Sequence, residues 1–129
     1  MSILWWTGLV IGWALALGII AIGGAYLARN AANAAGFGLT VTVPPEARAW
    51  WQVKGIRDLT TGVLVIAFTF AGTDRLPLLL GVLAIVPIGD MLIVLGQRGN
   101  TARALGIHGL TALLLLLAAV LMGIGHAAW

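Results

Sequence analysis

The hydrophobic pattern divides the chain into four long apolar runs separated by more polar stretches. The runs cover about residues 3–27, 51–72, 78–95 and 102–124. An α-helix rises about 1.5 Å per residue, so about 20 apolar residues cross the hydrocarbon core of a bilayer. The pattern therefore predicts an all-α, polytopic membrane protein: an antiparallel bundle of four transmembrane helices in one domain, residues 1–129.

The longest connection, residues 34–50, joins the first two runs. The first helix is expected to continue beyond the membrane as far as Asn33, with polar residues on one face. Three patterns then follow: a glycine-rich break at 36–38, an alternating extended stretch at 39–43, and a proline-led helix start at 44–48. The next two connections are short turns, and Thr101 is the expected N-cap of the last helix.

Composition supports the membrane assignment. Apolar residues make up 61% of the chain and charged residues only 9%, whereas a soluble domain has roughly 25% charged residues. The absence of cysteine excludes disulfides, thiolate metal sites and cysteine nucleophiles. The first apolar run lacks a basic leader and a convincing cleavage site, so it is expected to remain as a membrane helix.

The basic residues predict the orientation in the membrane. All but one of the seven Lys and Arg residues fall on the side that holds the first and third connections. The exception is Arg75, in the second connection. Because cytoplasmic segments are enriched in Lys and Arg, the pattern places both termini outside and the 34–50 loop in the cytoplasm.

A charged stripe opens the second apolar run. Lys54, Arg57, Asp58 and Thr61 follow i, i+3, i+4, i+7 spacing and therefore share one helix face. Charges at membrane depth are costly, so they usually face a partner or a wet cavity and mark a functional site.

Ionisable groups on three different runs lie at a similar depth. Asp58, Asp90 and His108 are each about six or seven residues in from the same side, roughly 10 Å. This coincidence predicts one site with these three as catalytic groups, although which carboxylate is the acid and which the base stays open. A purely structural ion-pair network is the alternative.

The expected substrate-binding residues surround these three groups. They are Lys54, Arg57 and Thr61 on the charged stripe, and Tyr26, Asn30 and Asn33 on the extension of the first helix. Two carboxylates and an imidazole suit general acid–base catalysis, and the cations could hold an oxyanion, a phosphate or a carboxylate. The same cations disfavour a metal ion, so neither a metal nor a cofactor is expected.

These features favour a membrane-embedded acid–base enzyme of isomerase, cyclase or epoxide-opening type. Its substrate would be a lipophilic small molecule, such as a terpenoid or polyketide, that enters from the bilayer. One alternative is a small-molecule, proton or anion binding or transport component, and another is a structural accessory subunit. The other expected partners are membrane lipids and a second copy of the chain, through the GxxxG face of Gly8 and Gly12; nucleic acid is not expected.

Three motifs also support a family assignment. The segments KGIRDLTTG (54–62), VPIGD (86–90) and ALGIHG (104–109) resemble a family of small four-span membrane proteins of bacteria and fungi, catalogued as a domain of unknown function. The build is also loosely similar to DoxX-like membrane proteins. The resemblance implies that the charged stripe, Asp90 and His108 belong together, and membership in natural-product pathways would favour an enzyme.

Overall fold

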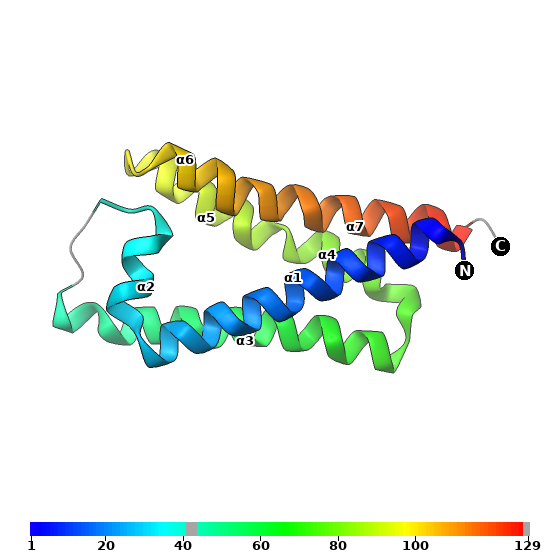
Figure 1. Cartoon of the computed structure of the whole chain (residues 1–129), viewed down its shortest axis with the longest axis horizontal. Helices are drawn as coiled ribbons and strands as arrows, with labels where there is room; N and C mark the ends of the chain where they lie inside the picture. The colour runs from blue at the N-terminus through cyan, green and yellow to red at the C-terminus, as the bar shows by residue number, and fades with distance from the viewer. Residues whose placement is uncertain (41–43, 128–129) are drawn as a thin grey trace.

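The structure, a computed structural model, describes residues 1–40 and 44–127, and every regular element in these ranges is helical (Figure 1). In chain order the elements are α1 (Ile3–Ala28), α2 (Asn30–Phe37), η1 (Pro45–Ala47), α3 (Arg48–Ala71), η2 (Thr73–Arg75), α4 (Leu76–Leu83), α5 (Ile85–Gly96), α6 (Thr101–Arg103), η3 (Ala104–Gly109) and α7 (Leu110–Ala127). The prediction of an all-α protein is confirmed.

Three helical stretches of the described chain are long and apolar enough to cross a membrane. They are Ile3–Ala28, Thr73–Gly96 and Thr101–His126, which is consistent with an integral membrane protein. The remaining long helix, α3, has 24 residues but carries the charged stripe. The three charges of the stripe, together with Arg48 at the start of the helix, lower its apolar character below that of the other stretches.

Helix α1 contacts both α7 and α3 through glycines. A Cβ added at Gly8 would lie 2.7 Å from the carbonyl oxygen of Ala118 on α7. One added at Gly23 would lie 2.7 Å from the carbonyl oxygen of Gly55 on α3. Backbones this close tolerate only glycine, and Gly12 is likewise buried, against Leu80. The Gly8 and Gly12 face is thus occupied inside the chain, so an oligomer through it would have to displace α7 and α4.

The main apolar core lies at the end of the molecule where the termini meet. Trp5, Leu76, Leu80 and Met122 are fully buried there. The Ser2 side chain accepts a hydrogen bond from the Trp5 amide as the N-cap of α1 and donates to the Gly125 carbonyl at 3.3 Å. The first turn of α1 is thereby held against the last turns of α7.

The expected continuous extension of α1 is wrong. Helix α1 ends at Ala28, Arg29 leaves the helical region with φ −138° and ψ 55°, and α2 runs across the long helices at the end opposite the termini (Figure 1). The Asn33 side-chain amide closes the corner, because its Nδ2 donates to the carbonyls of Ala25 (3.0 Å) and Arg29 (2.8 Å). The same two carbonyls also accept from the backbone amides of Arg29 (2.7 Å) and Asn33 (3.2 Å), so the side chain adds a second donor at each.

The structure tests two of the three patterns predicted between α2 and α3. Gly38 adopts φ 111°, so the glycine-based break is confirmed at that position. Within the predicted alternating stretch, residues 41–43 lie outside the described residues. The predicted helix start at 44–48 is confirmed, because η1 leads directly into α3.

The second half of the chain contains two irregular segments that position the site. Helices α4 and α5 are separated at Ala84, one turn before Pro87, because proline cannot donate to the carbonyl four residues earlier. The segment η3, which carries His108, is π-helical; such wide turns are frequent at functional sites. The expected N-cap Thr101 is wrong by one residue, since the Asn100 side chain accepts from the Arg103 amide at 2.9 Å.

Candidate functional site

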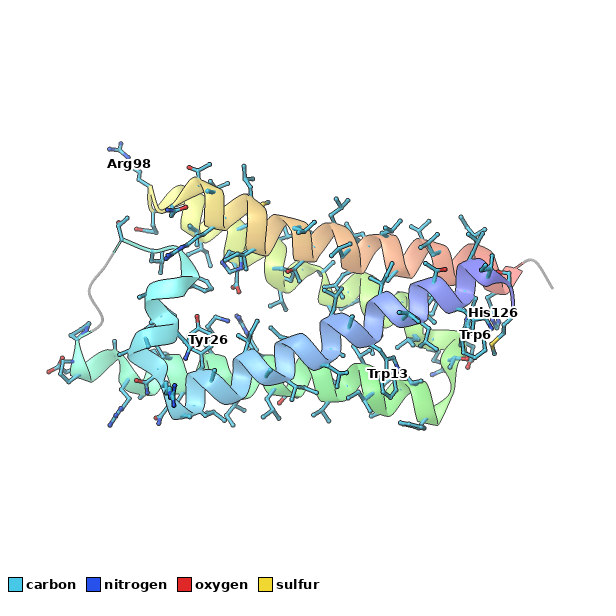
Figure 2. All side chains as sticks on the ribbon, viewed as in Figure 1. Trp6, Trp13, Tyr26, Arg98 and His126 are labelled. Carbon is cyan, nitrogen blue, oxygen red and sulfur yellow. The ribbon has the colours of Figure 1, made fainter. Side chains whose placement is uncertain are left out.

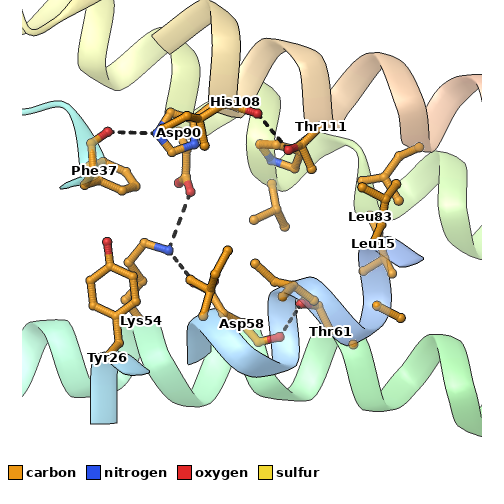
Figure 3. A pocket seen from close by; sticks show the side chains of 18 of the residues that line it. Leu15, Tyr26, Phe37, Lys54, Asp58, Thr61, Leu83, Asp90, His108 and Thr111 are labelled. Carbon is orange, nitrogen blue, oxygen red and sulfur yellow. Dashed lines mark hydrogen bonds and ion pairs between the residues drawn. The ribbon is translucent and has the colours of Figure 1, made fainter. Parts of the chain in front are cut away.

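A cavity of about 260 Å³ lies between α1, α2, α3, α4, α5 and the η3–α7 helix (Figure 3). Its wall toward the termini is apolar, with Leu15, Ile19, Val65 and Leu115 among its residues. Its end beneath α2 is polar. The polar lining residues are Tyr26, Asn33, Lys54, Asp58, Thr61, Asp90, His108 and Thr111. An apolar cavity with a few polar groups gathered at one end is the usual form of a small-molecule site.

Two cations and two carboxylates form a closed cluster at the polar end. The Lys54 Nζ donates to Asp58 Oδ2 and lies 3.9 Å from Asp90 Oδ2. The Arg57 Nη2 lies 3.1 Å from Asp58 Oδ1 and 3.1 Å from Asp90 Oδ2. The formal charges sum to zero, and the cluster ties α3 to α5. Burial of charge is costly without such pairing and hydrogen bonding.

The members of this cluster differ in burial. The Asp58 side chain is 1% exposed and that of Asp90 11%, while Lys54 is 13% and Arg57 42% exposed. Asp58 is therefore the most buried charge. Lys54 contacts it more closely than it contacts Asp90, whereas Arg57 lies 3.1 Å from both carboxylates. The Arg57 side chain covers the outer side of the cluster and is absent from the cavity lining.

His108 is held by the backbone of α2. Its Nε2 lies 2.9 Å from the Phe37 carbonyl oxygen, and its ring lies 4.7 Å from the Phe37 ring (Figure 3). A carbonyl oxygen can only accept, so Nε2 carries the hydrogen. In the neutral imidazole the lone pair then lies on Nδ1. Among the described residues, Nδ1 has no hydrogen-bond partner, and His108 is one of the residues that line the cavity.

Aromatic rings enclose the Lys54 ammonium. Its Nζ lies 4.7 Å from the centre of the Tyr26 ring and 5.2 Å from that of Phe37, distances at which a cation is attracted to an aromatic face. The Tyr26 hydroxyl donates to the Asn33 carbonyl at 3.1 Å, and the Tyr26 ring stacks on Trp51. These contacts hold Lys54 between α1, α2 and α3. Figure 2 labels Tyr26, the α1 residue of this group.

The structure brings most of the predicted site residues together. Those that line the one cavity are Asp58, Asp90, His108, Lys54, Thr61, Tyr26 and Asn33. Two predicted binding residues do not line it: Arg57, which covers the outside of the cluster, and Asn30, which is buried in α2. The Thr61 hydroxyl donates to the Asp58 carbonyl at 2.7 Å.

Sequence reasoning missed two residues of the site. Phe37 was assigned to a helix break, yet it supplies the carbonyl for His108 and a ring beside Lys54. Thr111 lies one turn after His108 and lines the cavity, with its hydroxyl donating to the Ile107 carbonyl at 2.7 Å. The i, i+3 spacing of Thr111 from His108 could have placed it on the same helix face. No sequence pattern indicates that the backbone carbonyl of Phe37 binds His108.

Fold and site together define a class of protein: a small, all-helical, apolar chain with a charged cluster and a histidine around one internal cavity. The family model described as Domain of unknown function (DUF4267) matches residues 16–122. The chain therefore belongs to this family, and the match includes all three motifs that suggested it. No curated protein and no solved structure matches the chain. The looser likeness to DoxX-like proteins thus remains a resemblance of general build.

Proposed function

We propose that this protein is a membrane-embedded, cofactor-independent enzyme that performs acid–base chemistry on a lipophilic small molecule. The observation that carries the proposal is the cavity, in which a long apolar wall leads to Lys54, Asp58, Asp90 and His108. A lipophilic molecule would lie along the wall and present its polar end to these groups.

Within this class of reaction, the pairing of the charges favours isomerisation. Both carboxylates are bound to cations, so neither is placed as the proton donor that epoxide opening or cyclisation needs. His108 Nδ1 is the group available to accept a proton, and a base within hydrogen-bonding reach of its target suits this role. In an isomerisation it removes a proton beside a carbonyl group and returns it at another carbon, so atoms and electrons balance without a co-reactant.

Lys54 would stabilise the charge that develops on the substrate oxygen. An ammonium group has three N–H donors, of which Asp58 takes one and the more distant Asp90 a second. The third is available to a carbonyl oxygen in the cavity. A positioned donor of this kind stabilises an enolate, as in an oxyanion hole.

Hydrogen–deuterium exchange into a bound molecule tests this proposal. The full chain is purified in mild detergent, incubated in D₂O, and its lipophilic contents are extracted and analysed by mass spectrometry. The wild type is expected to retain a molecule that gains deuterium at carbon, and His108→Gln to retain it without the gain. Gln keeps a donor for the Phe37 carbonyl, so loss of exchange would report loss of the base rather than loss of α2.

Other outcomes separate the alternative functions. A retained molecule with no exchange in the wild type would favour a binding or transport component. No retained molecule in any preparation would favour a structural accessory subunit. The observation that favours this second candidate is the complete mutual pairing of the four charged side chains, because such networks can serve fold specificity alone.

We also propose the membrane arrangement that this function needs: an antiparallel four-span bundle in which α3 is the fourth span. At about 1.5 Å per residue, α3 is about 36 Å long, and its charges are paired inward rather than left to lipid. Both ends of the chain meet at one end of the molecule, with Arg98 at the other (Figure 2). The excess of basic residues at the Arg98 end supports cytoplasmic placement of that end.

Cysteine labelling tests the topology, because the chain has no native cysteine. Asp74→Cys, in the turn at the terminal end, is expected to react with a membrane-impermeant maleimide in intact cells. Gln97→Cys, in the turn at the opposite end, is expected to react only after permeabilisation. Labelling of both positions in intact cells would place them on the same side of the membrane and would contradict a single span between them. Labelling of Gln97→Cys but not Asp74→Cys in intact cells would contradict the proposed orientation.

A further inference from the structure

We infer that the cavity takes an elongated, uncharged molecule whose polar end is a single carbonyl or hydroxyl group, and that this molecule enters sideways between α1 and η3. The inference rests on the proposed function, in that it names the substrate class of the same cavity. It excludes fatty acids, phosphorylated lipids and amines as preferred ligands.

The charge balance of the site is the reason for expecting an uncharged ligand. Lys54 and Arg57 are each already bound to carboxylates, and the four charges sum to zero. An anionic end would have to displace Asp58, which is 1% exposed, from Lys54. A cationic end would have to compete with two cations that are already in place. Either would bring an unpaired charge into an apolar cavity, which is costly.

The remaining hydrogen-bonding groups fit a neutral oxygen. His108 Nδ1 can accept from a hydroxyl group, because Nε2 is occupied by the Phe37 carbonyl. The third N–H of Lys54 can donate to a hydroxyl or a carbonyl oxygen. The Thr61 and Thr111 hydroxyls already donate to backbone carbonyls at 2.7 Å, so they can offer a ligand only their acceptor lone pairs. A single hydroxyl or carbonyl oxygen on the ligand can therefore pair with the hydrogen-bonding groups that remain in the site.

The shape of the cavity indicates an elongated ligand. Its lining on α1 extends from Gly12 to Tyr26, a separation of about 21 Å at the usual helical rise. Over most of this length the lining is aliphatic, including Leu15, Ile19 and Val65. A compact polar metabolite would leave this wall without a partner.

The exposed lining residues mark the opening. Ile22 on α1 and Ile107 in η3 both line the cavity, yet they are 45% and 46% exposed. Gly36 on α2 is the other exposed lining residue. The cavity therefore opens through the side of the molecule, between α1 and η3, past two aliphatic side chains. An apolar side opening suits access from the bilayer, whose interior an uncharged molecule crosses far more readily than a charged one.

The end of the cavity beneath α2 is closed by contacts between the two halves of the chain. The carbonyls of Ala35, Phe37 and Gly38 accept from Arg103, His108 and the Asn100 amide, the last at 2.7 Å. Such donors satisfy the last carbonyls of a helix and complement its dipole. These bonds hold α2 against the second half of the chain at this end of the cavity.

Photo-crosslinking with competition tests the inference. The probe is a dodecanol that carries a diazirine in its chain, added to the full chain in lipid nanodiscs, with labelled residues identified by mass spectrometry. Unlabelled 1-dodecanol and 2-dodecanone are expected to compete, whereas dodecanoate and dodecylamine should compete at least about tenfold more weakly, equivalent to about 1.4 kcal/mol. Ile107→Trp should reduce labelling inside the cavity severalfold. The matched control Leu110→Trp, at an exposed position outside the lining, should not.

The outcomes distinguish this inference from the proposed function. Equal or stronger competition by dodecanoate or dodecylamine would overturn the neutral-ligand assignment while leaving a lipophilic site intact. Unchanged labelling in Ile107→Trp would overturn the side opening. No labelling of cavity residues by the alcohol would count against this inference and against the proposed function together.

Discussion

The charged cluster makes a specific prediction about stability, because its two carboxylates are not equivalent. Asp58→Asn removes the charge that is 1% exposed and that contacts both cations, leaving Lys54 and Arg57 with Asp90 alone. Breaking a buried pair by removing one partner costs about 3–5 kcal/mol. Since Arg57 is 42% exposed and water screens part of its charge, the lower half of this range is expected.

Asp90→Asn should cost less. Asp90 lies 3.1 Å from Arg57 but 3.9 Å from Lys54, and both cations would keep Asp58 as a partner. The loss is then close to that of one hydrogen bond to a charged group, about 1.5–3 kcal/mol. The expected order of stability is therefore wild type, then Asp90→Asn, then Asp58→Asn.

A titration with SDS, followed by the fluorescence of the six tryptophans, measures these differences in free energy of unfolding. Asp74→Asn, at an exposed turn, is the control and should be close to wild type. The double variant Lys54→Met with Asp58→Asn restores charge balance and should be more stable than Asp58→Asn alone. Equal losses for Asp58→Asn and Asp90→Asn, or a double variant with additive losses, would refute the assignment of Asp58 as the centre of the cluster.

Three further predictions concern the contacts that shape the cavity. Gly23→Ala should destabilise the protein by about 1–3 kcal/mol in the same titration, because the new Cβ would meet backbone atoms of α3. The control Gly24→Ala has no atom within 4 Å of its Cβ and should be neutral or slightly stabilising, so equal effects of the two variants would contradict the close helix contact. Asn100→Ala should cost about 1 kcal/mol as a lost N-cap and Thr101→Ala much less, and the reverse order would contradict the assigned cap. Arg103→Met removes the donor to the Ala35 carbonyl and should speed amide exchange in α2 severalfold by hydrogen-exchange mass spectrometry; unchanged exchange would show that this contact does not hold α2 in place.

Much of the fold and site was predictable because it depends on spacing along single helices. Apolar runs of sufficient length gave the long helices, and i, i+3, i+4 spacing put Lys54, Arg57 and Asp58 on one face. Counting residues from the helix ends was enough to predict that Asp90 and His108 lie at the depth of Asp58. All three line the cavity. These inferences need only the helical rise and no knowledge of neighbouring helices.

The corner between α1 and α2 was not predictable, for a physical reason. No Gly or Pro marks Arg29, and the residues around it are mostly alanines, which favour a continuous helix. The break depends instead on tertiary and side-chain contacts: the Asn33 amide on the Ala25 and Arg29 carbonyls, and the Tyr26 hydroxyl on the Asn33 carbonyl. The hydrogen-bond partner of His108 could not be predicted for a related reason. Every residue has a backbone carbonyl, and nothing in the sequence distinguishes that of Phe37.

The arrangement of the cluster changes how experiments on this site should be interpreted. Asp58 binds both cations within its own helix α3, and Asp90 joins the same two cations to α5. A loss of activity in Asp58→Asn would therefore combine lost structure with lost chemistry. His108 differs, because one ring nitrogen is fixed by α2 and the other has no partner among the described residues. A change at Nδ1 therefore alters reactivity with the least effect on packing. For this reason His108→Gln, and not a substitution of either aspartate, is the variant that separates an enzyme from a scaffold.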